Sequence, residues 1–334
     1  MSKRVIGLAS LMLSSALLLS ACGQSDTETL TVYSGRSEEL VGPIIDQFSD
    51  AAGIEVKVRY GSTSEMAATI LEEGDNSPAD VFFAQDPGGL GAVTHLFTPL
   101  PDAILNQVDP KFRSPDEKWV GISGRARVIV YNTDKLSESD LPDDIWEFTD
   151  PKWKGRIGWA PINGSFQAMV TAMRVLWGDE KTIQWIDGIQ ANDPQVYPKN
   201  TPIVDAAGRG EIDVGFPNHY YLFRFLAEHG DSFAARNYYL RGGGPGAVIL
   251  VAGAGILKTS ENKELAERFL DFLLSRVAQQ YFATQTFEYP VVEGIKTDRL
   301  LKPVSEVNSP QIDMADLADL EGTLKLLRET GLVP

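Results

Sequence analysis

Cysteine is almost absent from this sequence: Cys22 is the single one in 334 residues, and there are only three histidines. One cysteine excludes an intramolecular disulfide, and a zinc-type cluster of cysteines is likewise excluded. Basic residues are also few, with 30 lysines and arginines against 46 aspartates and glutamates and a formal net charge of −16. A chain this acidic lacks the basic face that nucleic-acid binding needs, so we expect no nucleic-acid partner.

Sequence motifs of enzymes are also lacking. The three histidines, His95, His219 and His229, have no convincing nucleophile partner, and neither a G-x-S-x-G elbow nor a phosphate-binding glycine loop occurs. The glycine run at 242–246 is typical of a turn before a strand. We therefore predict that the protein is not an enzyme. His219 is expected to point away from the tyrosines that follow it, as a supporting or surface residue.

The N-terminus has the pattern of an export signal. Lys3 and Arg4 precede an apolar run over residues 5–19, which is shorter than the roughly 20 residues of a membrane span. The run ends in Leu-Ser-Ala-Cys, which resembles a bacterial lipobox, in which the cysteine is lipidated. We predict a lipoprotein signal peptide over 1–21, lipidation at Cys22 and a tether over 22–29. The protein would then lie in the cell envelope outside the cytoplasm, periplasmic or on the outer face of the cell membrane, and contact the membrane only through its lipid anchor.

The remaining chain of about 310 residues exceeds the usual size of one core and predicts two lobes. Strands expected at 30–33, 54–60 and 79–83 alternate with helices at 38–52 and 64–73. This βαβαβ order predicts an α/β protein with a largely parallel sheet. The alternation continues over later segments, which are predicted as strands at 128–131, 213–216 and 248–253 and as helices at 166–176, 182–189 and 261–274.

Ligands of open α/β sheets bind at the carboxyl ends of strands, and the loops expected there are rich in glycine and polar residues. One of them, Asn-His-Tyr-Tyr at 218–221, opens a helix after Pro217. Because the backbone is not yet regular at a helix start, the adjacent side chains of Tyr220 and Tyr221 can converge on one point. The alternative is that both tyrosines pack on the surface or in the core.

From residue 30 to the C-terminus the chain resembles the bacterial ferric-ion-binding proteins of iron ABC transporters. The similarity is carried by LTVYSGRSEELV, VRYGSTSEMAATILEEG, SPADVFFAQD, SGRARVIVYNTDKL, PKWKGRIGW, GRGEIDVGFPNHYY and GAGILKTSENKELAERFLDFLLS.

The resemblance implies a periplasmic-binding-protein type II fold, in which two α/β lobes enclose a ligand cleft and are joined by two crossover strands. The crossings are expected near Arg127 and Val248. The implied lobe boundaries are 30–126 with 249–301 for lobe 1, and 127–248 with 302–334 for lobe 2.

The resemblance also implies that Tyr220 and Tyr221 ligate one ferric ion, which the protein delivers to a membrane permease, and we expect it to act as a monomer. Ferric iron is a hard cation that prefers anionic oxygen. A phenol has a pKa near 10, so a strong nearby cation is needed to keep it ionised at neutral pH.

Three other ligand positions of the family differ here. Ser37 stands where some relatives have a histidine, and Gln85 where they have a glutamate; Asn163 stands where others have a further tyrosine. Octahedral iron needs about six donors, so we expect exogenous anions or water to complete the shell.

A synergistic anion such as carbonate needs donors of positive charge, which Arg36 and Arg125 can provide through the planar fork of a guanidinium. By similarity, the anion site contains Arg36, Arg125, Asn163, Gly164, Ser165, Asn200 and Asn218. Further possible cleft residues are Tyr33, Ser37, Gln85 and Asp86. For each arginine, and for Arg127 above all, the alternative is a salt bridge at a lobe edge.

A rival function shares the same architecture: a binding protein for an organic anion, such as a phosphonate or a sugar phosphate. The missing histidine and glutamate and the two arginines leave this alternative open. Because phenolate–iron complexes absorb visible light, a colourless protein after ferric loading would favour the rival.

Overall fold

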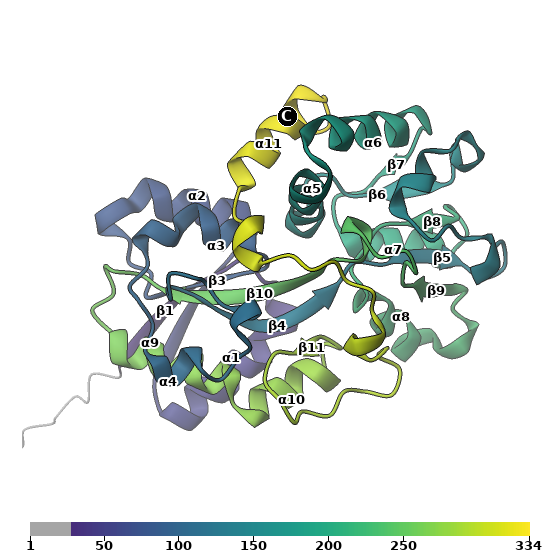
Figure 1. Ribbon diagram of the computed structural model, residues 1–334. Helices are drawn as coiled ribbons and strands as arrows, with labels where there is room; N and C mark the ends of the chain where they lie inside the picture. The colour runs from purple at the N-terminus through teal and green to yellow at the C-terminus, as the bar shows by residue number, and fades with distance from the viewer. Residues whose placement is uncertain (1–27) are drawn as a thin grey trace, which may run out of the picture.

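Two β-sheets organise the chain in the computed structural model, which describes residues 28–334 (Figure 1). The predicted signal peptide and Cys22 lie outside the described residues. No helix among residues 28–334 has both the length and the apolar character that a membrane span requires. We call the half built on the six-stranded sheet lobe 1 and the half built on the five-stranded sheet lobe 2.

The sheet of lobe 1 begins with the predicted βαβαβ unit. Its strands are, in spatial order, β11 (Tyr289–Pro290), β4 (Val120–Ala126), β10 (Ile249–Ile256), β3 (Val81–Ala84), β1 (Thr29–Ser34) and β2 (Glu55–Tyr60). Its helices are α1 (Glu38–Ala52), α2 (Thr63–Glu73), α3 (Pro87–Val93), α4 (Asp102–Leu105), α9 (Lys263–Leu274) and α10 (Arg276–Thr284). Helix α1 buries Leu40, Val41, Ile44, Ile45 and Phe48 and ends at Gly53, whose φ of 69° is the left-handed conformation that glycine adopts readily.

The sheet of lobe 2 is built from shorter strands. They are, in spatial order, β7 (Gln195–Val196), β6 (Ile157–Trp159), β8 (Val214–Gly215), β5 (Ile129–Asn132) and β9 (Ala235–Tyr238). Its helices are α5 (Gly164–Trp177), α6 (Asp179–Ala191), α7 (Asn200–Gly208) and α8 (Tyr221–His229). The core of this lobe contains the fully buried Trp153, Trp159 and Trp185.

The prediction of a largely parallel sheet is wrong, because both sheets are mixed. Strand β1 pairs in parallel with β2 and β3, but β10 is antiparallel to β3 and β4, and β11 is antiparallel to β4. In lobe 2, β6 is parallel to β7 and β8, whereas β5 is antiparallel to β8 and β9. Hydrophobic periodicity identifies strands without giving their direction. The strands that run against the rest of their sheet are β10 and β5, which enter from the other lobe, and the short edge strand β11.

The chain crosses between the lobes twice, at the predicted places. Strand β4 leads through Arg127 and Val128 into β5, and Val248 leads back into β10. Strands β4 and β10 run side by side as an antiparallel pair in which Ile249 faces Ala126 (Figure 1). The Arg127 amide donates to the Val248 carbonyl at 3.0 Å. The two crossings are therefore hydrogen-bonded to each other and form one connection.

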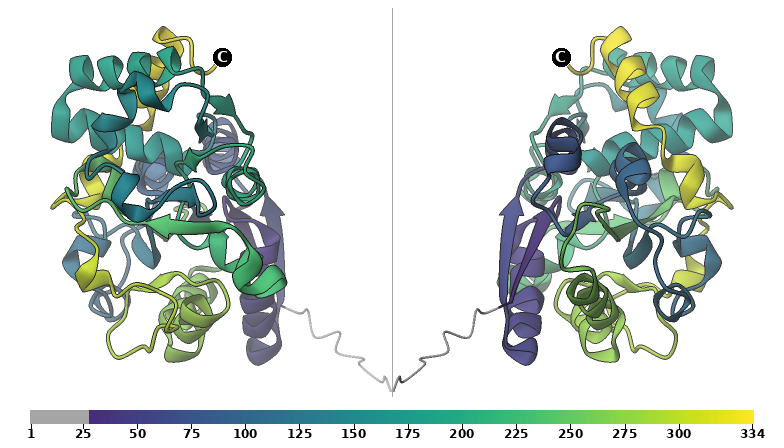
Figure 2. Two further views of the ribbon diagram at one scale, coloured as in Figure 1. Left: turned by 90° about the vertical axis from the view of Figure 1, so that its right-hand side faces the viewer. Right: turned by 90° about the vertical axis from the view of Figure 1, so that its left-hand side faces the viewer.

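The C-terminal segment contacts both lobes. It ends in α11 (Leu320–Glu329), which lies near α5 and α6 in the views of Figures 1 and 2 and packs against α5 of lobe 2 and α3 of lobe 1. The hydroxyls of Thr323 and Thr171 are 2.8 Å apart. On the other side, a Cβ atom at Gly91 of α3 would lie 2.3 Å from Ala318, so this close approach requires a glycine. The assignment of 302–334 to lobe 2 alone stays a prediction.

Candidate functional site

The adjacent tyrosines lie face to face at the start of α8. Tyr220 precedes the helix with helical backbone angles, φ −71° and ψ −22°, and Tyr221 is its first residue. Their ring centroids are 4.2 Å apart, with 29° between the ring planes. Tyr220 is 1% exposed and Tyr221 is partly buried. The two phenol rings therefore come together at the start of α8 as expected, although the backbone at Tyr220 is helical rather than irregular.

The Tyr220 hydroxyl is buried without a hydrogen-bond partner among residues 28–334. Burial raises its pKa well above 10, and the neighbouring Tyr221 raises it further, whereas Arg36 and Arg125 lower it. A neutral phenol is therefore the stable form without a ligand. A cation bound at the oxygen would reverse that preference, because the charged form would then be paired.

Arg36 lies in the loop between β1 and α1 and is buried. Its Nη2 atom forms an ion pair with Glu288, whereas Nε and Nη1 have no partner among the described residues. Burial lowers the pKa of Arg36, but Glu288 and the two phenols raise it, and the net shift is upward. The guanidinium thus interacts electrostatically with both phenols and keeps two nitrogens without partners among the described residues.

Arg125 lies near the end of β4 and is fully buried. None of its three guanidinium nitrogens has a hydrogen-bond partner among residues 28–334. Burial lowers its pKa, and the positive charge of Arg36 lowers it further. A buried cation with no partner is costly, so the surroundings of Arg125 suit an added anion.

Arg127 occupies the crossing between the lobes and is also buried. Its Nη1 atom donates to Asn218 Oδ1 at 3.1 Å and to Ser165 Oγ at 3.5 Å, and its Nη2 atom donates to the Phe216 carbonyl. Burial lowers its pKa to about 9. Arg127 therefore makes hydrogen bonds to neutral groups of lobe 2, and the alternative of a salt bridge at the lobe edge is wrong for it.

The start of α5 carries a network of small polar groups. Asn163 caps the helix, and its Oδ1 atom accepts from the Ser165 amide at 3.1 Å and the Ser165 hydroxyl at 2.6 Å. Asn200 Nδ2 donates to Asn163 Oδ1 and to Ser165 Oγ, both at 3.2 Å. These bonds fix the amide orientations and leave Asn200 Oδ1 and Asn218 Nδ2 buried without partners among the described residues.

Asp86 brings a carboxylate from lobe 1 to the start of α5. Its Oδ1 atom caps α3 by accepting from the Gly89 amide at 3.1 Å. Its Oδ2 atom is buried and unpartnered among residues 28–334, and a Cβ atom added to Gly164 would lie only 2.7 Å from it. Burial raises the pKa of Asp86, while Arg125 and the amides of Gly88 and Gly89 lower it, and the net shift is upward. The two lobes are therefore in close contact at Asp86 and Gly164.

Within residues 28–334, no side-chain hydrogen bond or ion pair joins the predicted cleft residues Tyr33, Ser37 and Gln85 to this group. The Tyr33 hydroxyl donates to Glu73 at 2.9 Å, and the guanidinium of Arg59 lies over its ring. Ser37 is exposed at the start of α1. Gln85 is partly buried, and its backbone amide donates to Thr63 Oγ1 at 3.0 Å.

Two residues of the site were missed or misplaced by the sequence analysis. Glu288 was missed; its pairing with Arg36 spans 252 positions. The interpretation of His219 as a surface residue is wrong, because it is fully buried. His219 Nδ1 accepts from the Ala126 amide at 3.1 Å, and Nε2 donates to the Phe287 carbonyl at 2.8 Å. Burial lowers its pKa to about 4, so at neutral pH it is an uncharged support that ties the tyrosine segment to lobe 1.

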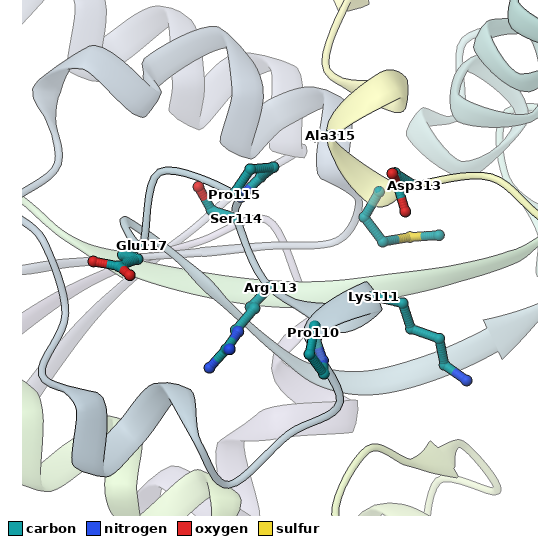
Figure 3. Close-up of a pocket in the computed structure, with 9 residues that line it drawn as sticks. Pro110, Lys111, Arg113, Ser114, Pro115, Glu117, Asp313 and Ala315 are labelled. Atoms are coloured by element: carbon teal, nitrogen blue, oxygen red, sulfur yellow. The ribbon is translucent and has the colours of Figure 1, made fainter.

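Other candidate sites are poor. A surface hollow of about 350 Å³ lies between the loop at 110–117 and the C-terminal segment at 313–315, and none of its lining residues belongs to the group described above (Figure 3). Within residues 28–334, histidine, cysteine, aspartate and glutamate side chains form no group of three or more that could hold a metal ion. The phenol pair with its surrounding arginines is the better candidate.

Comparison with known proteins identifies a family and similar sequences. The sequence profile of the family described as bacterial extracellular solute-binding protein matches residues 43–306. The chain is 35% identical over 308 residues to the major ferric iron-binding protein of Neisseria meningitidis, covering 91% of this chain and 93% of that protein.

Solved structures of iron-binding proteins also resemble this chain. Iron-bound HitA from Pseudomonas aeruginosa is 35% identical, covers 91% of this chain and 100% of its own, and superposes with a TM-score of 0.88. A Trichodesmium protein in complex with iron and citrate ligands is 28% identical, with coverage of 91% and 100% and a TM-score of 0.78. The predicted two-lobe type II fold and the predicted resemblance to ferric-ion-binding proteins are therefore confirmed.

Proposed function

This chain belongs to the bacterial extracellular solute-binding proteins, and we propose that it captures ferric ion with Tyr220 and Tyr221 and delivers it to the permease of an iron ABC transporter. The observation that carries the proposal is the pair of stacked phenol rings beside two buried guanidiniums, Arg36 and Arg125, that keep free donors. Ionised phenols are hard oxygen donors of the kind that ferric iron prefers. The named relatives, which are iron-binding proteins, support the same cargo.

A synergistic anion completes the iron shell in this proposal. Three buried arginines and the carboxylates of Asp86 and Glu288 leave one positive charge at the site. A ferric ion with two phenolates adds one more. Since net charge buried away from water is costly, a dianion such as carbonate balances the pair.

The anion site is assigned to Arg36, Arg125, Asn163, Gly164, Ser165, Asn200 and Asn218. Arg125, Asn218 and Arg36 supply unpartnered donors. Gly164 gives the anion close access to the start of α5, where helix amides favour negative charge.

Capture works without covalent chemistry, by closure of lobe 2 over lobe 1 about the paired crossings β4 and β10, which is a hinge motion. The proposed lobe boundaries are 30–126 with 249–301, and 127–248 with 302–334. We further propose that Cys22 is lipidated after removal of residues 1–21, that residues 22–29 form the tether, and that the monomer works on the outer side of the membrane.

The test is a ferric titration of the mature chain followed by visible absorbance, with and without carbonate. We expect a phenolate–iron band that saturates near one ion per chain and strengthens when carbonate is present. Tyr197→Phe is the matched control, because its hydroxyl bonds Gln195 outside the site, and it should behave as the wild type. A protein that stays colourless at saturating iron while binding a phosphonate or a sugar phosphate would establish the rival function.

A further inference from the structure

Glu288 is a buried carboxylate that holds neither iron nor anion in the proposed function. It is fully buried in the loop before β11, where one oxygen pairs with Arg36 and the other accepts from the Ser123 hydroxyl at 2.5 Å. Both oxygens are thus occupied by groups of lobe 1. The carboxylate is fixed beside an arginine of the anion site without being offered to the ligand.

The backbone that carries Glu288 is held in place by lobe 2. The preceding Phe287 accepts a hydrogen bond from His219 Nε2 at 2.8 Å, and its ring stacks on Phe223 of α8 with centroids 4.6 Å apart. Phe287 has a φ of 57°, a left-handed conformation that bulky residues rarely adopt. Such strain persists only where the surroundings determine the geometry. The place of Glu288 is therefore set by packing on both sides of the cleft.

The two arginines nearest the phenols differ because of this carboxylate. Arg125 has no partner at any of its three nitrogens, whereas Arg36 has one nitrogen bound to Glu288 and two free. An anion at the free nitrogens of Arg36 would lie close to the negative charge of Glu288. In a buried site, where charges are poorly screened, that repulsion weakens anion binding.

We propose that Glu288 is a counter-charge that lowers the affinity of Arg36 for a small oxyanion, so that the anion and its ferric ion can leave when the lobes open. The inference rests on the proposed function, since it concerns the anion that function requires. The direction in which anion affinity changes when Glu288 loses its charge distinguishes this role from a structural one. Losing a structural contact weakens anion binding, whereas losing a counter-charge strengthens it.

The test uses the iron-free mature chain with inorganic phosphate as the probe, and hydrogencarbonate in a second series. Glu288→Gln keeps the side-chain shape and removes the charge; its amide oxygen can still accept from Arg36, and its amide nitrogen can donate to the Ser123 hydroxyl oxygen. We expect it to bind phosphate more tightly than the wild type by calorimetry, on the order of tenfold. Phosphate should also raise its melting temperature more than that of the wild type, since at the same concentration a ligand that binds more tightly stabilises the folded state more.

The matched control is Glu73→Gln. Glu73 also pairs with an arginine, Arg59 at 3.5 Å, and accepts from the hydroxyls of Tyr33 and Ser77, but it lies outside the group around the phenols. Its phosphate affinity should equal that of the wild type. In an Arg36→Ala background, Glu288→Gln should lose its strengthening effect, because the effect acts through Arg36.

Equal or weaker phosphate binding by Glu288→Gln would overturn the inference. If that variant does not fold without anion, Glu288→Asp, which draws the charge back by one methylene, must still bind phosphate more tightly than the wild type. Weaker binding there would overturn the inference as well. Because no iron is present, the phosphate affinities do not depend on the ferric titration. A wild type that stays colourless with iron would overturn the proposed function without changing the comparison of phosphate affinities.

Discussion

The two lobes contribute different chemistry to the same site. Lobe 1 supplies most of the charge, through Arg36, Arg125, Asp86 and Glu288. Lobe 2 supplies phenols, amides and a hydroxyl, from Tyr220, Tyr221, Asn163, Ser165, Asn200 and Asn218. Lobe 1 has no phenol at the site, and the groups assigned to the anion are divided between Arg36 and Arg125 of lobe 1 and the start of α5 with Asn200 and Asn218 of lobe 2. In the proposed function, ferric iron and its anion therefore need groups of both lobes, which closure brings together.

Removing the phenols of lobe 2 should have the largest effect. Tyr220→Phe or Tyr221→Phe keeps the ring and its packing but deletes an anionic donor. Each should weaken ferric binding by more than about 100-fold, since even residues that only support metal ligands cost about 10–100-fold. The double variant should lose the visible band, while the melting temperature of the iron-free protein barely changes. Wild-type affinity in the double variant would contradict the ligand assignment.

Removing a charge of lobe 1 should have a smaller effect, because it acts through the anion. Arg125→Ala is expected to weaken ferric binding by about 10–100-fold, the usual range for groups one step removed from a metal. Carbonate- and phosphate-free buffer should mimic this change in the wild type and add little in the variant. Arg268→Ala, an exposed arginine on α9, is the control and should bind iron normally. Indifference of Arg125→Ala to both treatments would mean that protein side chains complete the iron shell.

Preventing close contact between the lobes should lower ferric affinity by a still smaller factor. In Gly164→Ala the added Cβ would lie 2.7 Å from Asp86 Oδ2, so the lobes must stay slightly apart. Overpacking of this kind costs about 1–3 kcal/mol, of which 1.4 kcal/mol corresponds to about tenfold in affinity. We expect ferric affinity to fall by about tenfold with the absorbance band unchanged in position. A shifted band would instead indicate that Gly164 affects the ligands of the iron.

The smallest effect concerns lobe 2 by itself, away from the site. Burial raises the pKa of Asp213, but hydrogen bonds from Lys135 at 2.8 Å and Arg156 at 2.5 Å outweigh it, and the net shift is downward. A lowered folded pKa means that the carboxylate stabilises the fold above the unfolded pKa of about 3.9 and loses this contribution as pH falls through the folded value.

The corresponding variant is Asp213→Asn. It should lower the free energy of unfolding by about 1 kcal/mol at neutral pH, with a difference from the wild type that vanishes in acid. Denaturant melts at several pH values measure it. Ferric binding should not change, and a large loss of iron affinity would show that the site is not confined to the residues assigned here.

The sequence predicts the neutral half of the site better than the charged half. Tyr220 and Tyr221 are adjacent in the chain, and a helix start suffices to bring their rings together. No strand was predicted over 120–126, so the place of Arg125 on β4 did not follow from the local pattern. The ion pair of Arg36 with Glu288 spans 252 positions, and no local pattern marks a glutamate between Phe287 and Tyr289 as the partner of a distant arginine.

Burial also limited the sequence analysis. A salt bridge at a lobe edge was the alternative for Arg127, and a surface position was one of two possibilities for His219, but both side chains are buried. Polar residues are usually exposed, and their burial here depends on the packing of two lobes that the local sequence does not reveal. The strands β1, β2, β3, β5, β8 and β10 were predicted with small shifts at their ends, whereas β4, β6, β7, β9 and β11 and the antiparallel pairing of the crossing strands were not predicted.

The most direct test of the central claim is the absorbance of the iron-loaded wild type followed from about pH 7 down to about pH 4. Each phenol must lose a proton to bind iron, and burial raises the pKa of Tyr220, so protons compete with the metal and affinity must fall in acid. The account predicts that the phenolate–iron band decays across this range, at higher pH when carbonate is absent and when citrate is added as a competitor. A band that stays constant down to about pH 4, with or without anion, would contradict ligation by both phenolates and a synergistic anion.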